Sequence, residues 1–101
     1  MSKILRIGGA CLNQIPMDWD HNLKNIKKVF QEAQENNIEL LCLPELCITG
    51  YGCEDMFLST WLCETAQAKL IELLPFTSGL TTCLGLPVRF EGQIYNCIAI
   101  I

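Results

Sequence analysis

A single glutamate is the strongest candidate for chemistry in this chain. Glu45 follows Pro44 directly after the apolar run 38–43, and most of its neighbours up to Ile48 are apolar. A carboxylate in such surroundings loses part of its hydration, which raises its pKa toward the range of a general base. We therefore consider Glu45 a candidate catalytic base. A solvated loop glutamate, or one satisfied by nearby backbone amides, is the alternative reading.

Other motifs near Glu45 carry weaker signals. The stretch 49–52 reads TGYG, which is compatible with a pocket rim whose aromatic wall is Tyr51, and equally with an ordinary turn. Two acidic pairs, at 18 and 20 and at 54 and 55, fit helix starts better than metal binding. The single histidine, His21, lies near no cysteine in the sequence, and neither a phosphate-binding glycine loop nor a serine-hydrolase elbow is present.

The cysteines are numerous but have no motif. Seven occur, at 11, 42, 47, 53, 63, 83 and 97, with no C-x-x-C pair and no signal-peptide pattern before them. Four of them (Cys11, Cys42, Cys83 and Cys97) lie in apolar runs, where a free cysteine behaves as a small hydrophobic residue. This pattern predicts neither a disulfide framework nor a zinc site, and it favours a reducing compartment, the cytosol.

Composition excludes several classes of protein. The 101 residues are 50% hydrophobic and 18% charged, which is atypical of a disordered chain. A formal net charge of -4 disfavours binding to nucleic acid. No apolar run approaches the roughly 20 residues that a membrane span needs. The length allows one small domain at most.

The order of elements predicts an α/β fold. Strands are expected at 4–13, 38–43, 81–88 and 93–101, helices at 21–36 and 60–74, and a short helical turn at 54–58. Asp18 or Asp20 is expected to cap the first helix, and the last two strands are expected to form a hairpin across 89–92. In such a β-α-β-α-β-β sheet, ligands bind beyond the carboxyl ends of the strands, where Glu45 lies. An enzyme, a small-molecule binding module and a structural piece of a larger assembly all remain open at this point.

Three stretches of the chain resemble one family. Residues 9–14 (GACLNQ) with Asp18, Trp19 and Asn22 resemble an opening strand and helix start of the nitrilase superfamily of carbon–nitrogen hydrolases. Residues 43–55 (LPELCITGYGCED) resemble its glutamate motif, and residues 85–88 (GLPV) with 94–96 (IYN) resemble the hairpin that precedes its catalytic lysine. The pair at 54 and 55 points within the superfamily to the glutaminase domains of glutamine-dependent NAD synthetases.

The resemblance implies a fold and a mechanism. The fold would be the N-terminal portion of a nitrilase-like αββα sandwich. Glu45 would be the general base, and Tyr51 would line the glutamine pocket or the ammonia exit. A cysteine would attack the amide of L-glutamine and a lysine would stabilise the oxyanion. The ammonia would pass to a synthetase domain that uses ATP and magnesium, while this chain itself holds no cofactor. The full-length protein would be a cytoplasmic homo-oligomer.

The resemblance also has gaps. Neither Lys69 nor Arg89 matches the family's lysine, and none of the seven cysteines matches its nucleophile, because Cys47 and Cys53 belong to the glutamate motif itself. Residues 1–101 are therefore expected to form a partial carbon–nitrogen hydrolase domain without the lysine, the nucleophilic cysteine or the synthetase domain. We predict that this chain alone has no glutaminase activity. Another amidase or nitrile hydrolase of the superfamily is one alternative, and an inactive orphan fragment is another.

Overall fold

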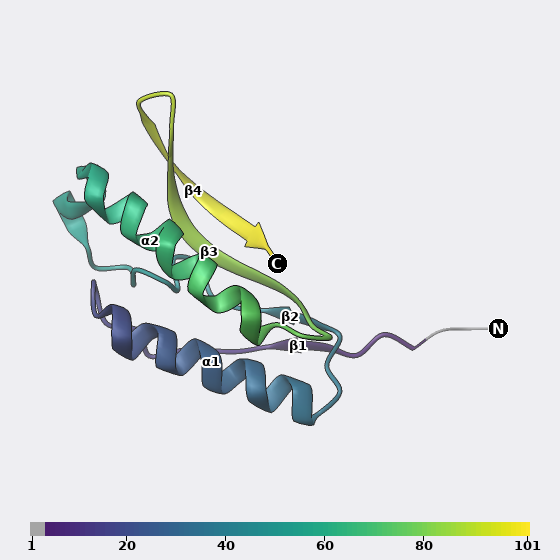
Figure 1. The fold of residues 1–101 in the computed structure, drawn as a ribbon. Helices are drawn as coiled ribbons and strands as arrows, with labels where there is room; N and C mark the ends of the chain where they lie inside the picture. Colours follow the sequence, from purple (N-terminus) through teal and green to yellow (C-terminus); the bar gives the residue numbers. More distant parts are fainter. Residues whose placement is uncertain (1–3) are drawn as a thin grey trace.

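The computed structural model describes residues 4–101, in which two helices lie on one side of a sheet (Figure 1). The expectation that the chain starts without a signal peptide concerns residues 1–3 in part, and these lie outside the described residues. The predicted element order is confirmed. The elements are β1 (Ile7–Gly9), α1 (Trp19–Glu35), β2 (Leu40–Cys42), the 3-10 helix η1 (Glu54–Leu58), α2 (Thr60–Leu73), the 3-10 helix η2 (Leu74–Phe76), β3 (Thr81–Phe90) and β4 (Gln93–Ile100).

The sheet is mixed, with its strands in chain order. β1 pairs with β2 and β2 with β3 in parallel, while β3 and β4 pair antiparallel. The predicted hairpin is confirmed, but its turn is tighter than the expected link 89–92. Glu91 and Gly92 alone make the turn, both with positive φ (49° and 77°), which matches the twist of the flanking strands.

The first two strands are shorter than predicted. β2 ends at Cys42 because Pro44 follows, and proline has no amide to donate to a ladder. β1 therefore finds pairing partners only over three residues, and its last contact is the amide of Ala10 donating to the carbonyl of Cys42 at 3.1 Å. The predicted strand 4–13 is thus wrong at both ends.

The two helices form one layer and share one core. Asp18 caps α1 by accepting from the amide of His21 at 3.2 Å, and Asn37 ends it in a left-handed conformation (φ 57°). Both helices bury one apolar side against the same face of the sheet (Figure 1). The helix residues of this core include Leu23, Ile26, Phe30, Ala33, Ala66 and Leu73.

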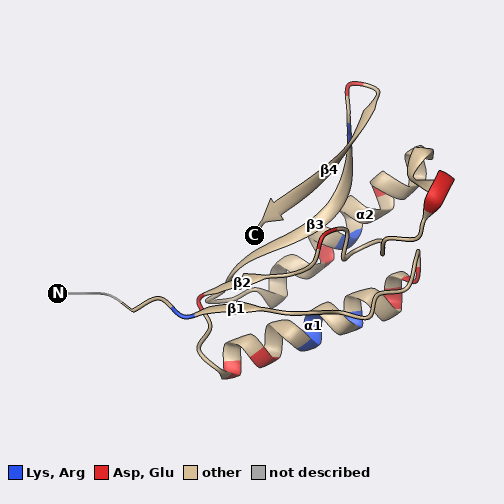
Figure 2. Cartoon of the chain, turned by 180° about the vertical axis from the view of Figure 1, so that it is seen from behind, with Lys and Arg blue, Asp and Glu red and all other residues tan. Residues whose placement is uncertain are grey.

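The sheet has a covered face and an open face. Leu41, Leu84 and Leu86 are buried beneath the helices. On the opposite face, which we call the open face, the exposed side chains include Ile7, Cys42, Asn96, Ile98 and Ile100. Charged residues lie mainly on the helices and in loops, and the strands carry almost none (Figure 2). The α/β class is confirmed, with one helix layer and one sheet layer of the expected sandwich.

The cysteines are distributed differently from the prediction. All seven are free. Cys11 and Cys42 are exposed and Cys83 and Cys97 half-buried, so the apolar runs around them did not place them in the core. Cys42 alternates with the buried Leu41 and therefore faces the open side of the sheet. The buried thiols are those of Cys47, Cys53 and Cys63. Within residues 4–101, no helix has the length and apolar character that crossing a membrane requires.

Candidate active site

Glu45 lies in the loop that follows β2, at the carboxyl end of the strand, as the sequence predicted. We call residues 43–53 the Glu45 loop. The amide of Leu43 still donates to the carbonyl of Cys83 at 2.8 Å, and the chain then turns sharply. Leu46 adopts a positive φ (50°), and the amide of Gly50 donates to its carbonyl at 2.8 Å. This turn holds Glu45 at the edge of the sheet.

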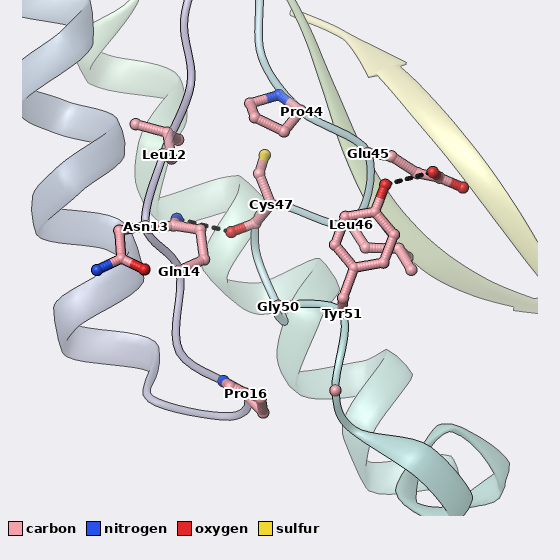
Figure 3. A pocket seen from close by; sticks show the side chains of 11 residues that line it. Leu12, Asn13, Gln14, Pro16, Pro44, Glu45, Leu46, Cys47, Gly50 and Tyr51 are labelled. Atoms are coloured by element: carbon pink, nitrogen blue, oxygen red, sulfur yellow. Dashed lines mark hydrogen bonds between the residues drawn. The ribbon is translucent and has the colours of Figure 1, made fainter.

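Two hydrogen-bond donors hold the Glu45 carboxylate. The Tyr51 hydroxyl donates to Oε2 and the Asn96 side-chain amide donates to Oε1 (Figure 3 shows the tyrosine contact). These two bonds, with that of Tyr51 the larger influence, lower the pKa of Glu45 below its ordinary value. The predicted increase in its pKa is therefore wrong. The side chain is exposed, so the donors outweigh the small desolvation that acts in the opposite direction.

Tyr51 lies next to Glu45 in the folded structure. It comes from the same loop, and its ring and Glu45 line a cavity of about 180 Å³ with Leu12, Gln14, Pro16, Pro44 and Cys47 among the other residues (Figure 3). Donation to the Glu45 carboxylate raises the pKa of the Tyr51 hydroxyl. The hydroxyl thus stays protonated at neutral pH and can serve only as a donor to the carboxylate.

Asn96 is a site residue to which the sequence analysis assigned no role. It lies on β4, 51 residues after Glu45 in the chain. Its signals in the sequence are its place in the family-like stretch 94–96 and the alternation of β4, which puts Asn96 on the same face as Ile98 and Ile100. The contact with Glu45 depends on the sheet order, which brings β4 next to β3 and β3 next to β2. Spacing along the chain cannot show it.

Gly85 on β3 supports the Glu45 loop from below. A Cβ atom at this position would lie 2.3 Å from the amide nitrogen of Leu46 and 2.9 Å from the Cα of Glu45. Both atoms are backbone, so the loop would have to move to admit any side chain. The amide of Ile48 also donates to the Gly85 carbonyl at 3.4 Å. Glycine is thus required here by close approach of two backbones.

A buried amide joins the Glu45 loop to the loop before α1. Asn22 is fully buried; its Nδ2 donates to the carbonyls of Ile15 (2.8 Å) and Ile48 (3.0 Å), and its Oδ1 accepts from the amide of Ile15 at 2.8 Å. Gln14 adds a second link by donating to the carbonyl of Cys47 at 2.8 Å (Figure 3). These bonds give partners to backbone groups of both loops, among them the carbonyls of Ile48 and Cys47 and the amide of Ile15.

The cysteine nearest to Glu45 is unsuited to attack. Cys47 is buried against β3, with its Sγ 3.8 Å from the carbonyl of Gly85, and burial raises the pKa of its thiol to about 11. Burial raises the pKa of Cys53 as well. Because the thiolate is the nucleophilic form, neither side chain supplies a nucleophile at neutral pH.

The basic residues considered in the sequence are engaged elsewhere. Lys69 pairs with Glu72 on α2 at 3.3 Å, and Arg89 donates to the carbonyl of Leu58 at 2.8 Å. In the described part of the chain, no cluster of His, Cys, Asp or Glu side chains is suited to hold a metal ion. Within the described residues, Glu45 is thus an oriented, ionised carboxylate with no nucleophile beside it.

Comparison with known proteins identifies the family. Residues 6–101 match the carbon–nitrogen hydrolase family. The chain belongs to this family. Among the curated carbon–nitrogen hydrolase relatives, the glutamine-dependent NAD(+) synthetases of Oryza sativa subsp. indica and Arabidopsis thaliana are each 38% identical over 97 residues. Each match covers 94% of this chain but 13% of the length of the relative.

Solved structures place the chain in the same fold. A glutamine-dependent NAD(+) synthetase from Cytophaga hutchinsonii superposes with a TM-score of 0.94 and 52% identity, over 96% of this chain and 17% of that one. The E41L mutant of an amidase from Nesterenkonia superposes with a TM-score of 0.82 and 23% identity, over 95% of this chain and 37% of that one. This second match concerns the fold alone. The predicted nitrilase-like fold is thereby confirmed for this carbon–nitrogen hydrolase chain.

Proposed function

We propose that this chain forms part of the glutaminase domain of a glutamine-hydrolysing NAD synthetase and supplies its general base, Glu45. The observation that carries the proposal is the carboxylate held by donors on both oxygens at the carboxyl end of β2. The 52% identity to the Cytophaga hutchinsonii synthetase supports glutamine as the substrate over other amides.

In this proposal Glu45 first accepts a proton and later donates it. It takes the proton from a cysteine thiol, and the resulting thiolate attacks the side-chain amide carbon of L-glutamine. When the C–N bond breaks, the proton passes to the leaving nitrogen and ammonia departs, leaving a thioester that water hydrolyses to glutamate. The nucleophilic cysteine and the oxyanion-stabilising lysine are not among the residues of this chain that match the family.

The proposal also assigns a role to Tyr51 and to the rest of the protein. The ring of Tyr51 borders the glutamine side chain, while its hydroxyl orients Glu45. The ammonia serves an amidation of deamido-NAD, for which ATP and magnesium belong to a synthetase domain and not to these residues. A homo-oligomer in the cytosol is proposed for the whole protein, on the family resemblance and on the free cysteines.

A domain graft tests this function. Residues 1–101 would replace the matching segment of the Cytophaga hutchinsonii synthetase, and ammonia release from glutamine would be measured. We expect the graft to be active, and Glu45→Gln to reduce its rate about 10²- to 10⁴-fold. Glu39→Gln, which changes an exposed glutamate just before β2, is the matched control and should leave the rate unchanged.

Three results would count against the proposal. A folded graft that releases no ammonia from glutamine would contradict it, and so would an active graft that tolerates Glu45→Gln. Turnover of small aliphatic amides in place of glutamine would favour the alternative of another amidase of the superfamily. The isolated chain should release no ammonia under the same conditions.

A further inference from the structure

We propose that Asn96 is a positioning residue that fixes the direction of the Glu45 carboxylate relative to the sheet. The inference rests on the proposed role of Glu45 as general base. It concerns which element holds the base, and it assigns a task to a residue of the β3–β4 hairpin.

The two oxygens of the Glu45 carboxylate have different donors. Asn96 donates to Oε1 and Tyr51 to Oε2, so each oxygen has one donor. The last torsion of a glutamate side chain is broad, and a carboxylate with one donor can rotate about it. Two donors on different oxygens remove this freedom. A carboxylate offers about four acceptor positions, so positions remain for an incoming proton.

The two donors come from different parts of the fold. Tyr51 lies six residues after Glu45 in the same loop and is exposed, so its bond fixes the carboxylate only relative to that loop. Asn96 lies on β4, opposite Pro87 of β3 in the antiparallel register. β3 is also the strand on which the loop rests through Gly85. The Asn96 bond therefore ties the carboxylate to the rigid sheet.

Asn96 also borders a hollow on the open face of the sheet. Asn96 and Glu45 together line a hollow of about 340 Å³ on the open face, with Cys42, Cys83 and Ile98 among the other lining residues. Its volume lies in the range of roughly 300–1,000 Å³ that is typical of small-molecule sites. The Asn96 bond thus holds the Glu45 carboxylate at the border of this hollow.

The charge state of Glu45 is consistent with this task. The Asn96 bond is the second of the two causes that lower the pKa of Glu45, after that of Tyr51. The other titratable groups around the carboxylate are the Tyr51 hydroxyl and the thiols of Cys42, Cys83 and Cys47. Removal of Asn96 should therefore favour the neutral carboxyl and raise its pKa.

The first experiment is an NMR titration of the whole 101-residue chain labelled with ¹³C at glutamate carboxyl carbons. The Glu45 resonance is assigned from Glu45→Gln. We expect Asn96→Ala to raise the pKa of Glu45, and Asn96→Asp to raise it further because a second carboxylate then faces the first. Gln93→Ala, an exposed position on the same strand whose side chain contacts Tyr95, should leave the titration unchanged.

The second experiment measures the rate of the graft described above. Asn96→Ala should reduce kcat about 10- to 100-fold with a smaller change in KM, and should move the acidic limb of the pH profile upward. Gln93→Ala should change neither. If Asn96→Ala fails to fold, as judged by circular dichroism, the near-isosteric Asn96→Leu, which has no donor and adds no charge, makes the same test.

The two experiments separate the failure of this inference from that of the proposed function. Shifted Glu45 titrations in a chain whose graft is inactive would retain the positioning role and reject the glutaminase proposal. An active graft in which Asn96→Ala leaves the titration, kcat and pH profile as they were would overturn the inference and retain the function.

Discussion

The two faces of the sheet differ sharply in environment. Beneath the helices, Leu84 is 0% and Leu86 2% exposed, whereas Ile98 and Ile100 on the neighbouring strand are 71% and 72% exposed on the open face. The residues are equally apolar and lie on strands that pair with each other. The difference therefore comes only from the helices, which cover one face.

The covered face stabilises this chain, whereas the candidate chemistry lies on the open face. Burial of apolar area stabilises the covered face, because each fully buried aliphatic side chain contributes about 1.5–3 kcal/mol. The candidate base and its donor Asn96 instead lie at the open face and its edge. Two positions depart from this division: Asn22 is polar yet buried beside the covered face, and Gly85 is buried on the open face by the Glu45 loop.

The largest effect is expected from truncation of a covered leucine. Leu84→Ala should reduce the free energy of unfolding of the chain by about 3 to 4 kcal/mol, since it removes a fully buried side chain and leaves a cavity. The matched change Ile98→Ala on the open face should cost less than about 0.5 kcal/mol. Urea denaturation of both variants measures the contrast. Equal losses at the two positions would show that the open face is covered in solution.

The next effect tests whether apolar burial alone supports the covered side. Asn22→Ala leaves the amide of Ile15 and the carbonyl of Ile48 without a partner, while the Ile15 carbonyl keeps its bond from the amide of Asp18, and it should cost about 2 to 3 kcal/mol. Asn25→Ala, on the same helix with less buried contacts, should cost less than about 1 kcal/mol. Thermal or urea unfolding compares them. If Asn22→Ala lowers the free energy of unfolding no more than Asn25→Ala does, the buried Asn22 amide does not stabilise the two loops.

A smaller effect is expected where the open face is covered by the Glu45 loop. Gly85→Ala places a methyl group against the backbone of Glu45 and Leu46, and should cost about 2 kcal/mol by overpacking. Gly9→Ala is the control, because its nearest neighbour would be 4.0 Å away. Denaturation gives the cost, and the amide NMR shifts of residues 45–48 should move only in Gly85→Ala. Unchanged shifts there would contradict the close approach.

The smallest effect is a pH dependence at the open edge. The folded pKa of Glu45 lies below its ordinary value of 4.5, so the unfolded chain binds more protons between these values. The stability from its two hydrogen bonds is complete above the ordinary value and is lost as pH falls through the folded pKa. Tyr51→Phe should flatten this slope, as measured by urea denaturation between about pH 3 and about pH 6.

Tyr95→Phe is the control for that pH series, because its hydroxyl donates to Gln93 and not to a carboxylate. It should leave the slope as in the parent chain. An equal slope in Tyr51→Phe and the parent would mean that the Tyr51 bond does not form in solution.

Much of the fold could be predicted from the sequence because its signals are local. Helical spacing in 21–36 and 60–74, the cap at Asp18 and the Asn37 stop each involve residues within a few positions of one another. Strand lengths were less predictable. β1 ends where its neighbour β2 ends, and that limit comes from Pro44, a residue far away in the chain.

The candidate site divides in the same manner. Glu45 could be found from its own neighbours, because it follows a buried strand, and Tyr51 from the same motif. Asn96, Gly85 and Asn22 stand in the family-like stretches, but their roles could not be assigned, since each makes a contact across 26 or more residues. The pKa of Glu45 was predicted with the wrong sign for this reason: its sequence neighbours are apolar, but the donors that decide it come from the folded loop and from β4.

By itself, the sequence determined the order of elements, the class of fold and the position of one carboxylate, because periodicity, capping and proline act over short distances. The tertiary structure alone decided which face of the sheet is covered, which cysteines are buried and which donors hold Glu45. These outcomes depend on contacts between segments that meet only after the sheet has assembled. Such contacts cannot be predicted from any one segment of the sequence alone.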